Sequence, residues 1–99
     1  AKMRYQLSEL FRQKYKKQNV RVRKAIYLAL KKFYKNHLDP SLNNHELQRE
    51  LKGLRSINIE GTKNDHRAVY EEIQENNKIF AYFENFGTHK ELFRNVQFH

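Results

Sequence analysis

The sequence contains no cysteine, one proline and three glycines among its 99 residues. Without cysteine the chain can form neither disulfides nor thiolate metal sites, which fits a reducing cytoplasm. No apolar run approaches the roughly 20 residues that cross a bilayer, and the lysine-rich N-terminus is not followed by the apolar stretch of a signal peptide. We therefore expect a cytoplasmic protein without a membrane segment. Its length suits one domain over residues 1–99, with flexible ends at 1–3 and 95–99.

Acidic residues are scarce in the first third of the chain. Residues 1–37 contain twelve lysines and arginines and one acid, Glu9, a charge of +11, whereas residues 38–99 contain eight basic and ten acidic residues, a charge of −2. Such a field attracts polyanions or an acidic protein partner. The alternative is that these lysines form the solvated faces of two amphipathic helices. Because acidic residues are nearly absent over so long a stretch, we favour the interpretation that this positive charge attracts a binding partner.

The last third of the chain predicts a β-hairpin. Two segments, 67–73 and 79–84, are rich in β-branched and aromatic residues, and the Asn76-Asn77 pair between them suits the positive φ angles of a two-residue turn. If that pair is the whole loop, three residues on each strand face one another at the far end: Asp65, His66 and Arg67 opposite Thr88, Gly87 and Phe86. Acid–base side chains and an arginine thereby converge with His89 at one edge of the sheet.

The segments before this hairpin predict helices and strands. Residues 5–7 are extended in character, Ser8 is suited to cap a first helix, and Gln18-Asn19 separates it from a second helix over Val20–Asn36. Residues 38–44 form a linker in which Pro40 stops the second helix, and residues 45–54 fit either a helical turn or a packed loop. Polar and apolar side chains alternate over residues 55–60, which predicts a strand with one buried face. Gly53 and Gly87 suit turns, and Thr88 suits the cap of a short closing helix that reaches about Arg94.

These elements predict an α+β fold in which an N-terminal helical hairpin packs on a small antiparallel sheet with a short C-terminal helix. Their order resembles the RelE superfamily of type II toxins, and within it the YafQ-like branch. Four motifs carry the resemblance, of which the last is the most specific: Leu42-Asn43-Asn44-His45-Glu46-Leu47, Leu51-Lys52-Gly53-Leu54-Arg55-Ser56, Asp65-His66-Arg67-Ala68-Val69-Tyr70 and Phe86-Gly87-Thr88-His89-Lys90-Glu91-Leu92-Phe93.

The resemblance implies a RelE-like toxin domain that cleaves mRNA in the ribosomal A site, against ribosomal RNA, and is silenced by a cognate antitoxin. It places four residues in the active site: His45, Asp65, His89 and Phe93. Two positions depart from the YafQ-like pattern, because Asn58 stands where that branch has a histidine and Asn85 where it has an arginine. The transition-state cation must then come from another residue, with Lys52, Arg55 and Arg67 as candidates.

RNA carries its own nucleophile, the 2′-OH, so cleavage without a metal needs a base, an acid and a cation for the developing phosphate charge. We assign base and acid to His45 and His89, in either order, with Asp65 orienting one of them or acting as base. The product would end in a 2′,3′-cyclic phosphate. The residues expected to contact RNA are Lys52, Arg55, His66, Arg67, Asn85 and Phe93. Phe93 either stacks on a base or packs the last helix on the sheet.

A metal site built from His45, Asp65, His66 and His89 is the weaker interpretation, since the sequence has no His-x-x-x-His or paired-ligand spacing. We expect neither a metal nor another cofactor. Two alternative functions compete with the ribonuclease. One is a ParE-like toxin that inhibits DNA gyrase without cutting RNA, and the His45–His89 combination argues against it. The other is a catalytically weakened member that only binds RNA, which the substitutions at 58 and 85 favour.

Overall fold

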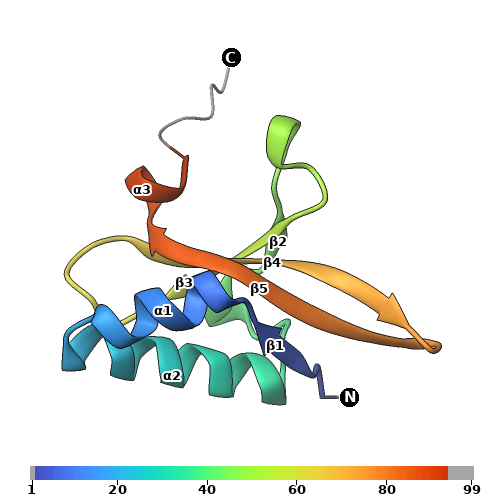
Figure 1. The fold of residues 1–99 in the computed structure, drawn as a ribbon, viewed down its shortest axis with the longest axis horizontal. Helices are drawn as coiled ribbons and strands as arrows, with labels where there is room; N and C mark the ends of the chain where they lie inside the picture. The colour runs from blue at the N-terminus through green and yellow to red at the C-terminus, as the bar shows by residue number, and fades with distance from the viewer. Residues whose placement is uncertain (1, 94–99) are drawn as a thin grey trace.

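A computed structural model describes residues 2–93 of the chain (Figure 1). Within that range a five-stranded sheet has the strand order β1-β5-β4-β3-β2. Helices α1 and α2 cover one face of this sheet, while α3 and the arm that contains β2 rise from the other face (Figure 1). The elements are β1 (Tyr5–Leu7), α1 (Glu9–Lys17), α2 (Val20–Lys35), the 3₁₀ turn η1 (Pro40–Leu42), β2 (His45–Glu46), the 3₁₀ turn η2 (Arg49–Leu51), β3 (Arg55–Ile59), β4 (His66–Glu75), β5 (Lys78–Thr88) and α3 (His89–Phe93).

The predicted α+β architecture is confirmed, with one difference in the sheet. Strands β2 to β5 pair antiparallel, as expected, but β1 runs parallel to β5 with Tyr5 beside Ala81, so the sheet is mixed. The predicted starts of both long helices are also confirmed, and α2 ends at Lys35, one residue before the predicted Asn36. Ser8 Oγ accepts the N–H of Phe11 at 3.0 Å, and Asn19 Oδ1 accepts the N–H of Val22 at 2.9 Å. These caps satisfy N–H groups that an α-helix cannot bond internally.

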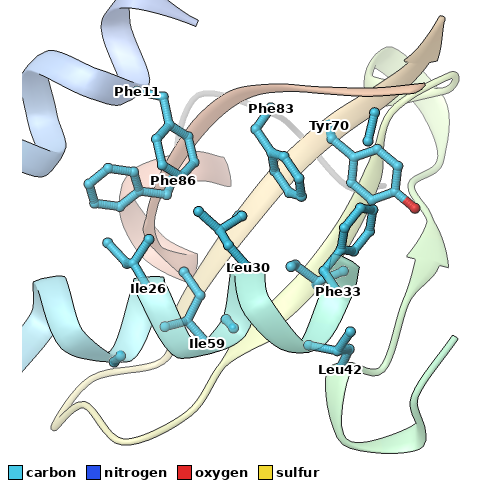
Figure 2. Close-up of a cluster of buried hydrophobic side chains, with 14 of the residues drawn as sticks. Phe11, Ile26, Leu30, Phe33, Leu42, Ile59, Tyr70, Phe83 and Phe86 are labelled. Atoms are coloured by element: carbon cyan, nitrogen blue, oxygen red, sulfur yellow. The ribbon is translucent and has the colours of Figure 1, made fainter. Parts of the chain in front are cut away.

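The core lies between the two long helices and the sheet (Figure 2). Phe33 of α2 meets Tyr70 of β4 and Phe83 of β5 with ring centroids 5.0 and 5.1 Å apart, and all three side chains are fully buried. Burying each such side chain contributes roughly 1.5–3 kcal/mol. The Tyr70 hydroxyl still has a partner, the Asn44 amide at 2.8 Å, and burial raises the pKa of this phenol. The aromatic cluster therefore fixes how the helices sit on the sheet.

The hairpin has the predicted turn but a different register at its far end. Asn76 and Asn77 have φ angles of 52° and 62°, as a two-residue turn requires, and Tyr70 faces Phe83 as predicted. A β-bulge then intervenes beside Tyr70, so that Val69 pairs with Asn85 and Glu84 is the extra residue. Beyond the bulge the predicted pairs shift by one: His66 faces Thr88, Arg67 faces Gly87 and Ala68 faces Phe86. The core residues of β5 show the same break, because Ala81 and Phe83 are two residues apart whereas Phe83 and Phe86 are three apart.

The face of the sheet opposite α1 and α2 we call the open face. Ala68 and Tyr70 point into the core, so Val69 between them points to the open face. Residues 45–54, for which the sequence predicted either a helical turn or a packed loop, contain β2 and the 3₁₀ turn η2. The predicted segment 95–99 and the helix end at Arg94 lie outside the described residues. Among residues 2–93 no helix is both long and apolar enough to span a membrane.

Candidate active site

A groove of about 200 Å³ lies on the open face, between α3 and the arm formed by β2 and η2. Val69 and Asn85, which are neighbours on β4 and β5, belong to its lining. The lining residues are otherwise mostly apolar: Leu47, Leu51, Leu54, Glu84, Leu92 and Phe93. An apolar groove with a few polar groups at its margin is the usual form of a binding site.

Asp65 and Arg67 form a two-pronged ion pair at the start of β4. Arg67 Nε lies 3.3 Å from Asp65 Oδ1, and Arg67 Nη2 lies 3.3 Å from Oδ2. Arg67 is one residue away from Ala68, a core residue, and therefore occupies the open face with its register partners Asn58 and Gly87. Its side chain is 22% exposed, against 60% for Asp65. The guanidinium is thus a partly desolvated cation with further N–H donors free for an anion.

His89 begins α3 directly beside this pair. Its backbone N–H donates to the Asp65 carbonyl at 2.7 Å, which ties the start of α3 to the start of β4. Thr88 caps α3 as predicted, because its Oγ1 accepts the N–H of Glu91 at 3.1 Å while its own N–H donates to Glu91 Oε1 at 2.8 Å. That hydrogen bond lowers the pKa of Glu91. Asp65 and Arg67 therefore lie beside the start of α3 at His89, as the hairpin predicted, whereas His66, which was predicted to join them, is buried and bonds to Thr62.

Gly87 lies inside β5, so its predicted role as a turn residue is wrong, whereas Gly53, at φ 101°, does occupy a turn. A Cβ built on Gly87 would lie 3.2 Å from Glu91 Oε1 and 3.6 Å from Leu92 Cγ. That spacing is tight, so the absence of a side chain lets α3 fold back closely over the end of β5. This close approach sets α3 against the end of β5, with Leu92 and Phe93 in the lining of the groove.

Phe93 lies under α3 with 6% of its surface exposed. Its ring meets the His89 imidazole edge-to-face, with centroids 4.7 Å apart and planes at 60°. Of the two roles predicted for Phe93, this burial favours packing. The contact also limits the orientations open to the His89 ring, so Phe93 is a positioning residue for the histidine.

His45 lies on β2, three strands away from β5 in the sheet. Its Nδ1 lies 2.8 Å from the Asn43 carbonyl, which leaves Nε2 available. His45 pairs with Ser56, Ser56 with Val69, and Val69 with Asn85, so it shares the open face with the groove floor. Strands are about 4.8 Å apart, so three intervals separate β2 from β5 by about 14 Å. His45 and His89 are not in contact, and only a substrate that spans the groove could reach both.

Three of the other residues expected to contact RNA lie elsewhere. Arg55 donates from Nε to Asn44 Oδ1 at 2.9 Å, within the hydrogen-bond network of Tyr70, and faces the helices. His66 is 8% exposed and bonds through Nδ1 to Thr62 Oγ1 at 2.9 Å, on the helix side of β4. Lys52 is exposed in the turn after η2 and does not line the groove. These placements give Arg55 and His66 structural partners, and neither is retained as an RNA contact.

Lys14 is a cation at this site that sequence reasoning missed. From α1 its Nζ donates to Asn85 Oδ1 at 2.7 Å and to the Phe86 carbonyl, and Asn85 Oδ1 also accepts the Phe86 N–H at 2.9 Å. Burial lowers the pKa of Lys14, and Glu91 opposes that shift. The contact joins residues 71 positions apart, so no local pattern could reveal it. The amide oxygen of Asn85 is thus occupied by Lys14.

One carboxyl group, that of Glu84, lines the other margin of the groove. Burial raises the pKa of Glu84, and the neighbouring Glu71 raises it further by hydrogen bonding and by charge. Within residues 2–93, at this site or elsewhere, no cluster of three or more histidine, aspartate or glutamate side chains is arranged to hold a metal ion. The site thus combines the Arg67 cation beside His89 with the Glu84 carboxyl group in the groove wall.

Comparison of the fold with known proteins finds several small toxins. No protein-family model and no curated protein sequence matches this chain. A YoeB/ParE toxin from Agrobacterium tumefaciens is similar with a TM-score of 0.67 and 16% identity, over 88% of this chain and 99% of that one. YafQ from Escherichia coli is similar with a TM-score of 0.63 and 22% identity, over 92% and 98%.

A third similar structure was determined as a complex. It is the toxin–antitoxin complex RelBE2 from Mycobacterium tuberculosis, with a TM-score of 0.58 and 18% identity over 90% of this chain and 100% of the matched chain. At such identities the likeness establishes the fold. The resemblance to RelE- and YafQ-like toxins that the motifs indicated is confirmed at that level.

Proposed function

We propose that this protein is the toxin of a type II toxin–antitoxin system and that it cleaves mRNA on the ribosome in the cytoplasm. The observation that carries the proposal is the Asp65–Arg67 ion pair beside His89, at the end of an open groove. A guanidinium next to an imidazole is what phosphodiester cleavage by the ribose 2′-OH requires, a charge acceptor beside a proton-transfer group. The fold likeness to YafQ and YoeB/ParE toxins supports the same class.

Arg67 supplies the cation in this mechanism. Asp65 holds one edge of its guanidinium, so the remaining N–H groups are already oriented before a phosphate arrives. A donor fixed in advance stabilises the developing phosphorane charge without reorganising during the reaction. Of the three cations considered from the sequence, Arg67 is the one on the open face beside His89.

His89 transfers one proton at the phosphate that Arg67 binds, and water transfers the other. Both protons belong to oxygens on one phosphorus atom, so His45, three strands away, contacts the RNA further along the groove. The ring of His89 is oriented by Phe93, and that of His45 by the hydrogen bond between Nδ1 and the Asn43 carbonyl. With about 14 Å between β2 and β5, the RNA strand lies over the sheet between the two histidines. The chemistry leaves a 2′,3′-cyclic phosphate on the upstream product and needs no metal, because the nucleophile is the RNA's own hydroxyl.

The regulator would be a cognate antitoxin. The basic first third of this chain, with a charge of +11 over residues 1–37, complements an acidic protein segment as well as ribosomal RNA. The similar RelBE2 structure is itself a toxin–antitoxin complex.

The test is mRNA cleavage in a purified translation system, read by mapping new 5′ ends. Wild type is compared with His89→Ala and His45→Ala, and with His37→Ala as a matched control, because His37 packs against Phe33 of α2 and is not part of the proposed site. We expect cuts within translated codons that disappear in His89→Ala, weaken in His45→Ala and persist in the control, with circular dichroism showing that all four proteins fold. Persistence of the cuts in His89→Ala would overturn the mechanism.

The same preparation separates the two alternatives. Growth arrest without RNA cuts, together with loss of gyrase supercoiling, would identify a ParE-like inhibitor. RNA that is bound but not cut would identify a weakened member, which the capture of Asn85 by Lys14 would explain.

A further inference from the structure

The outward face of α2, on the other side of the molecule from the groove, bears an exposed row of alternating aromatic and basic residues. Tyr27 and Tyr34 are 56% and 39% exposed, although large aromatic rings are normally covered. Lys24 and Lys31 are exposed as well, and the spacing of three, four and three residues aligns all four side chains on one helix face. We call this row, together with Arg4 and Lys2, the tyrosine platform.

The platform is hollowed rather than flat. Arg4, Tyr5, Tyr27, Lys31 and Tyr34 surround a depression of about 460 Å³. A hydrogen bond of 3.3 Å from the Met3 N–H to the Tyr34 carbonyl holds the N-terminal strand against the end of α2, which keeps Arg4 beside the tyrosines. Lys2 Nζ lies 5.4 Å from the centre of the Tyr34 ring. The depression is thus walled by rings and bordered by cations.

The charge on the α2 side of the platform has one sign, whereas Glu75 lies near Arg4 at its other border. Helix α2 contains six lysines and arginines and no acid, and no acidic residue occurs between Glu9 and Asp39. A polyanion is therefore attracted to this face. Exposed rings that alternate with cations provide stacking surfaces together with phosphate contacts, the combination by which proteins bind unpaired nucleotides. An apolar protein helix would instead meet Lys24 and Lys31 at the centre of its interface, where charged residues are depleted.

We propose that the tyrosine platform binds unpaired nucleotides, with bases stacked on Tyr27 and Tyr34 and phosphates held by Arg4 and Lys31. This goes beyond the proposed ribonuclease, since the platform lies on the far side of the core from the groove and contains none of its residues. A molecule with both surfaces holds two nucleic-acid segments at once. The platform anchors it to one strand or loop while the groove receives the strand to be cut.

The experiment uses the full chain carrying Arg67→Ala and His89→Ala, which silence the proposed groove site. Binding of a fluorescent oligoribonucleotide of about 12 nucleotides is followed by anisotropy over a series of salt concentrations. Tyr27→Ala with Tyr34→Ala should raise Kd by at least about tenfold without changing the salt slope, because stacking is uncharged. Lys31→Ala should lower the slope of log K against log salt by about 0.7.

Two controls make the result decisive. The Tyr27→Phe and Tyr34→Phe pair keeps the rings and should bind as the parent does. Leu28→Ala removes a neighbouring apolar side chain that is 50% exposed and should have no effect. A matching oligodeoxyribonucleotide shows whether the sugar is read, and polyglutamate reports charge alone. An unchanged Kd in the tyrosine-to-alanine pair would overturn the proposal, and so would an equal loss of polyglutamate binding. Neither result depends on RNA cleavage, so the proposal for the tyrosine platform and the proposal of ribonuclease activity are tested independently.

Discussion

Asp65 holds the guanidinium of Arg67 at two points, Nε to Oδ1 and Nη2 to Oδ2, both at 3.3 Å. A planar guanidinium held in this way has a fixed orientation, which the point charge of a lysine cannot reproduce. Arg67→Lys should therefore keep the charge but lower kcat for RNA cleavage by about 100-fold, the cost of losing one preorganised donor. Single-turnover cleavage with saturating enzyme measures this step. A variant that cleaves at the wild-type rate would remove Arg67 from the mechanism.

Asp65 acts in this scheme through Arg67, so the two substitutions should not add. Asp65→Asn alone is expected to slow cleavage by about tenfold by releasing the guanidinium, and little further when Arg67 is already alanine. The four-protein cycle is read from single-turnover rates. Fully additive losses would show that Asp65 has a separate role, such as the base considered from the sequence.

Phe93 provides a test of positioning against stacking. Phe93→Leu keeps an apolar side chain under α3 but removes the ring that meets His89. If Phe93 orients the imidazole, kcat falls by roughly tenfold while the affinity for RNA is unchanged. If Phe93 stacks on a base, Kd rises instead, by an amount equivalent to roughly 1–3 kcal/mol. Kd is measured with a non-cleavable 2′-deoxy substrate. Stability needs to be measured in parallel, because this buried ring also packs α3 on the sheet.

The sequence predicted the elements of this fold where one local rule determined the outcome. Ser8 and Asn19 cap helices whose apolar residues repeat at helical spacing, and Asn76-Asn77 adopt the positive φ angles of a tight turn. The direction of β1 could not be predicted, because a three-residue strand pairs in either direction.

The site was predicted less completely because it depends on how strands are aligned. One bulge beside Tyr70 shifts every pair beyond it, so Arg67 rather than His66 faces Gly87. The side on which His66 lies does not depend on the bulge, because alternation along β4 places His66 on the helix side with Ala68 and Tyr70. Its ring bonds there to Thr62 instead of facing the groove. Lys14 reaches Asn85 across 71 residues of sequence, a contact that only the packing of α1 on β5 creates.

Ser8 joins α1 to the sheet through two hydrogen bonds. Its Oγ accepts the Phe11 N–H at 3.0 Å and donates to the Glu84 carbonyl at 2.8 Å. Ser8→Ala should lower the free energy of unfolding by about 1–2 kcal/mol, the cost of a lost helix cap with a buried acceptor left unpaired. Chemical denaturation at neutral pH measures this change.

Ser56→Ala is the matched control for that substitution. Ser56 is fully buried, and within the described part of the chain its Oγ has no hydrogen-bond partner. Replacing an unpaired buried hydroxyl by a methyl group should be neutral or stabilising. A larger loss of stability in Ser56→Ala than in Ser8→Ala would contradict both assignments.

Glu84 gives the fold a dependence on pH that a single substitution removes. Burial and the adjacent Glu71 raise the pKa of Glu84 in the folded protein above the unfolded value of about 4.3. Between these two values the folded state binds more protons, so stability is highest below the unfolded pKa and decreases as pH rises toward the folded one. Glu84→Gln cannot ionise, and it should therefore unfold at a higher temperature than wild type at pH 7 but not at about pH 4. Thermal unfolding at the two pH values tests this, with Glu72→Gln, an exposed neighbour on β4, as the control. An equal gain at both pH values would mean that lost packing or hydrogen bonding, rather than charge repulsion across the groove wall, separates the two proteins.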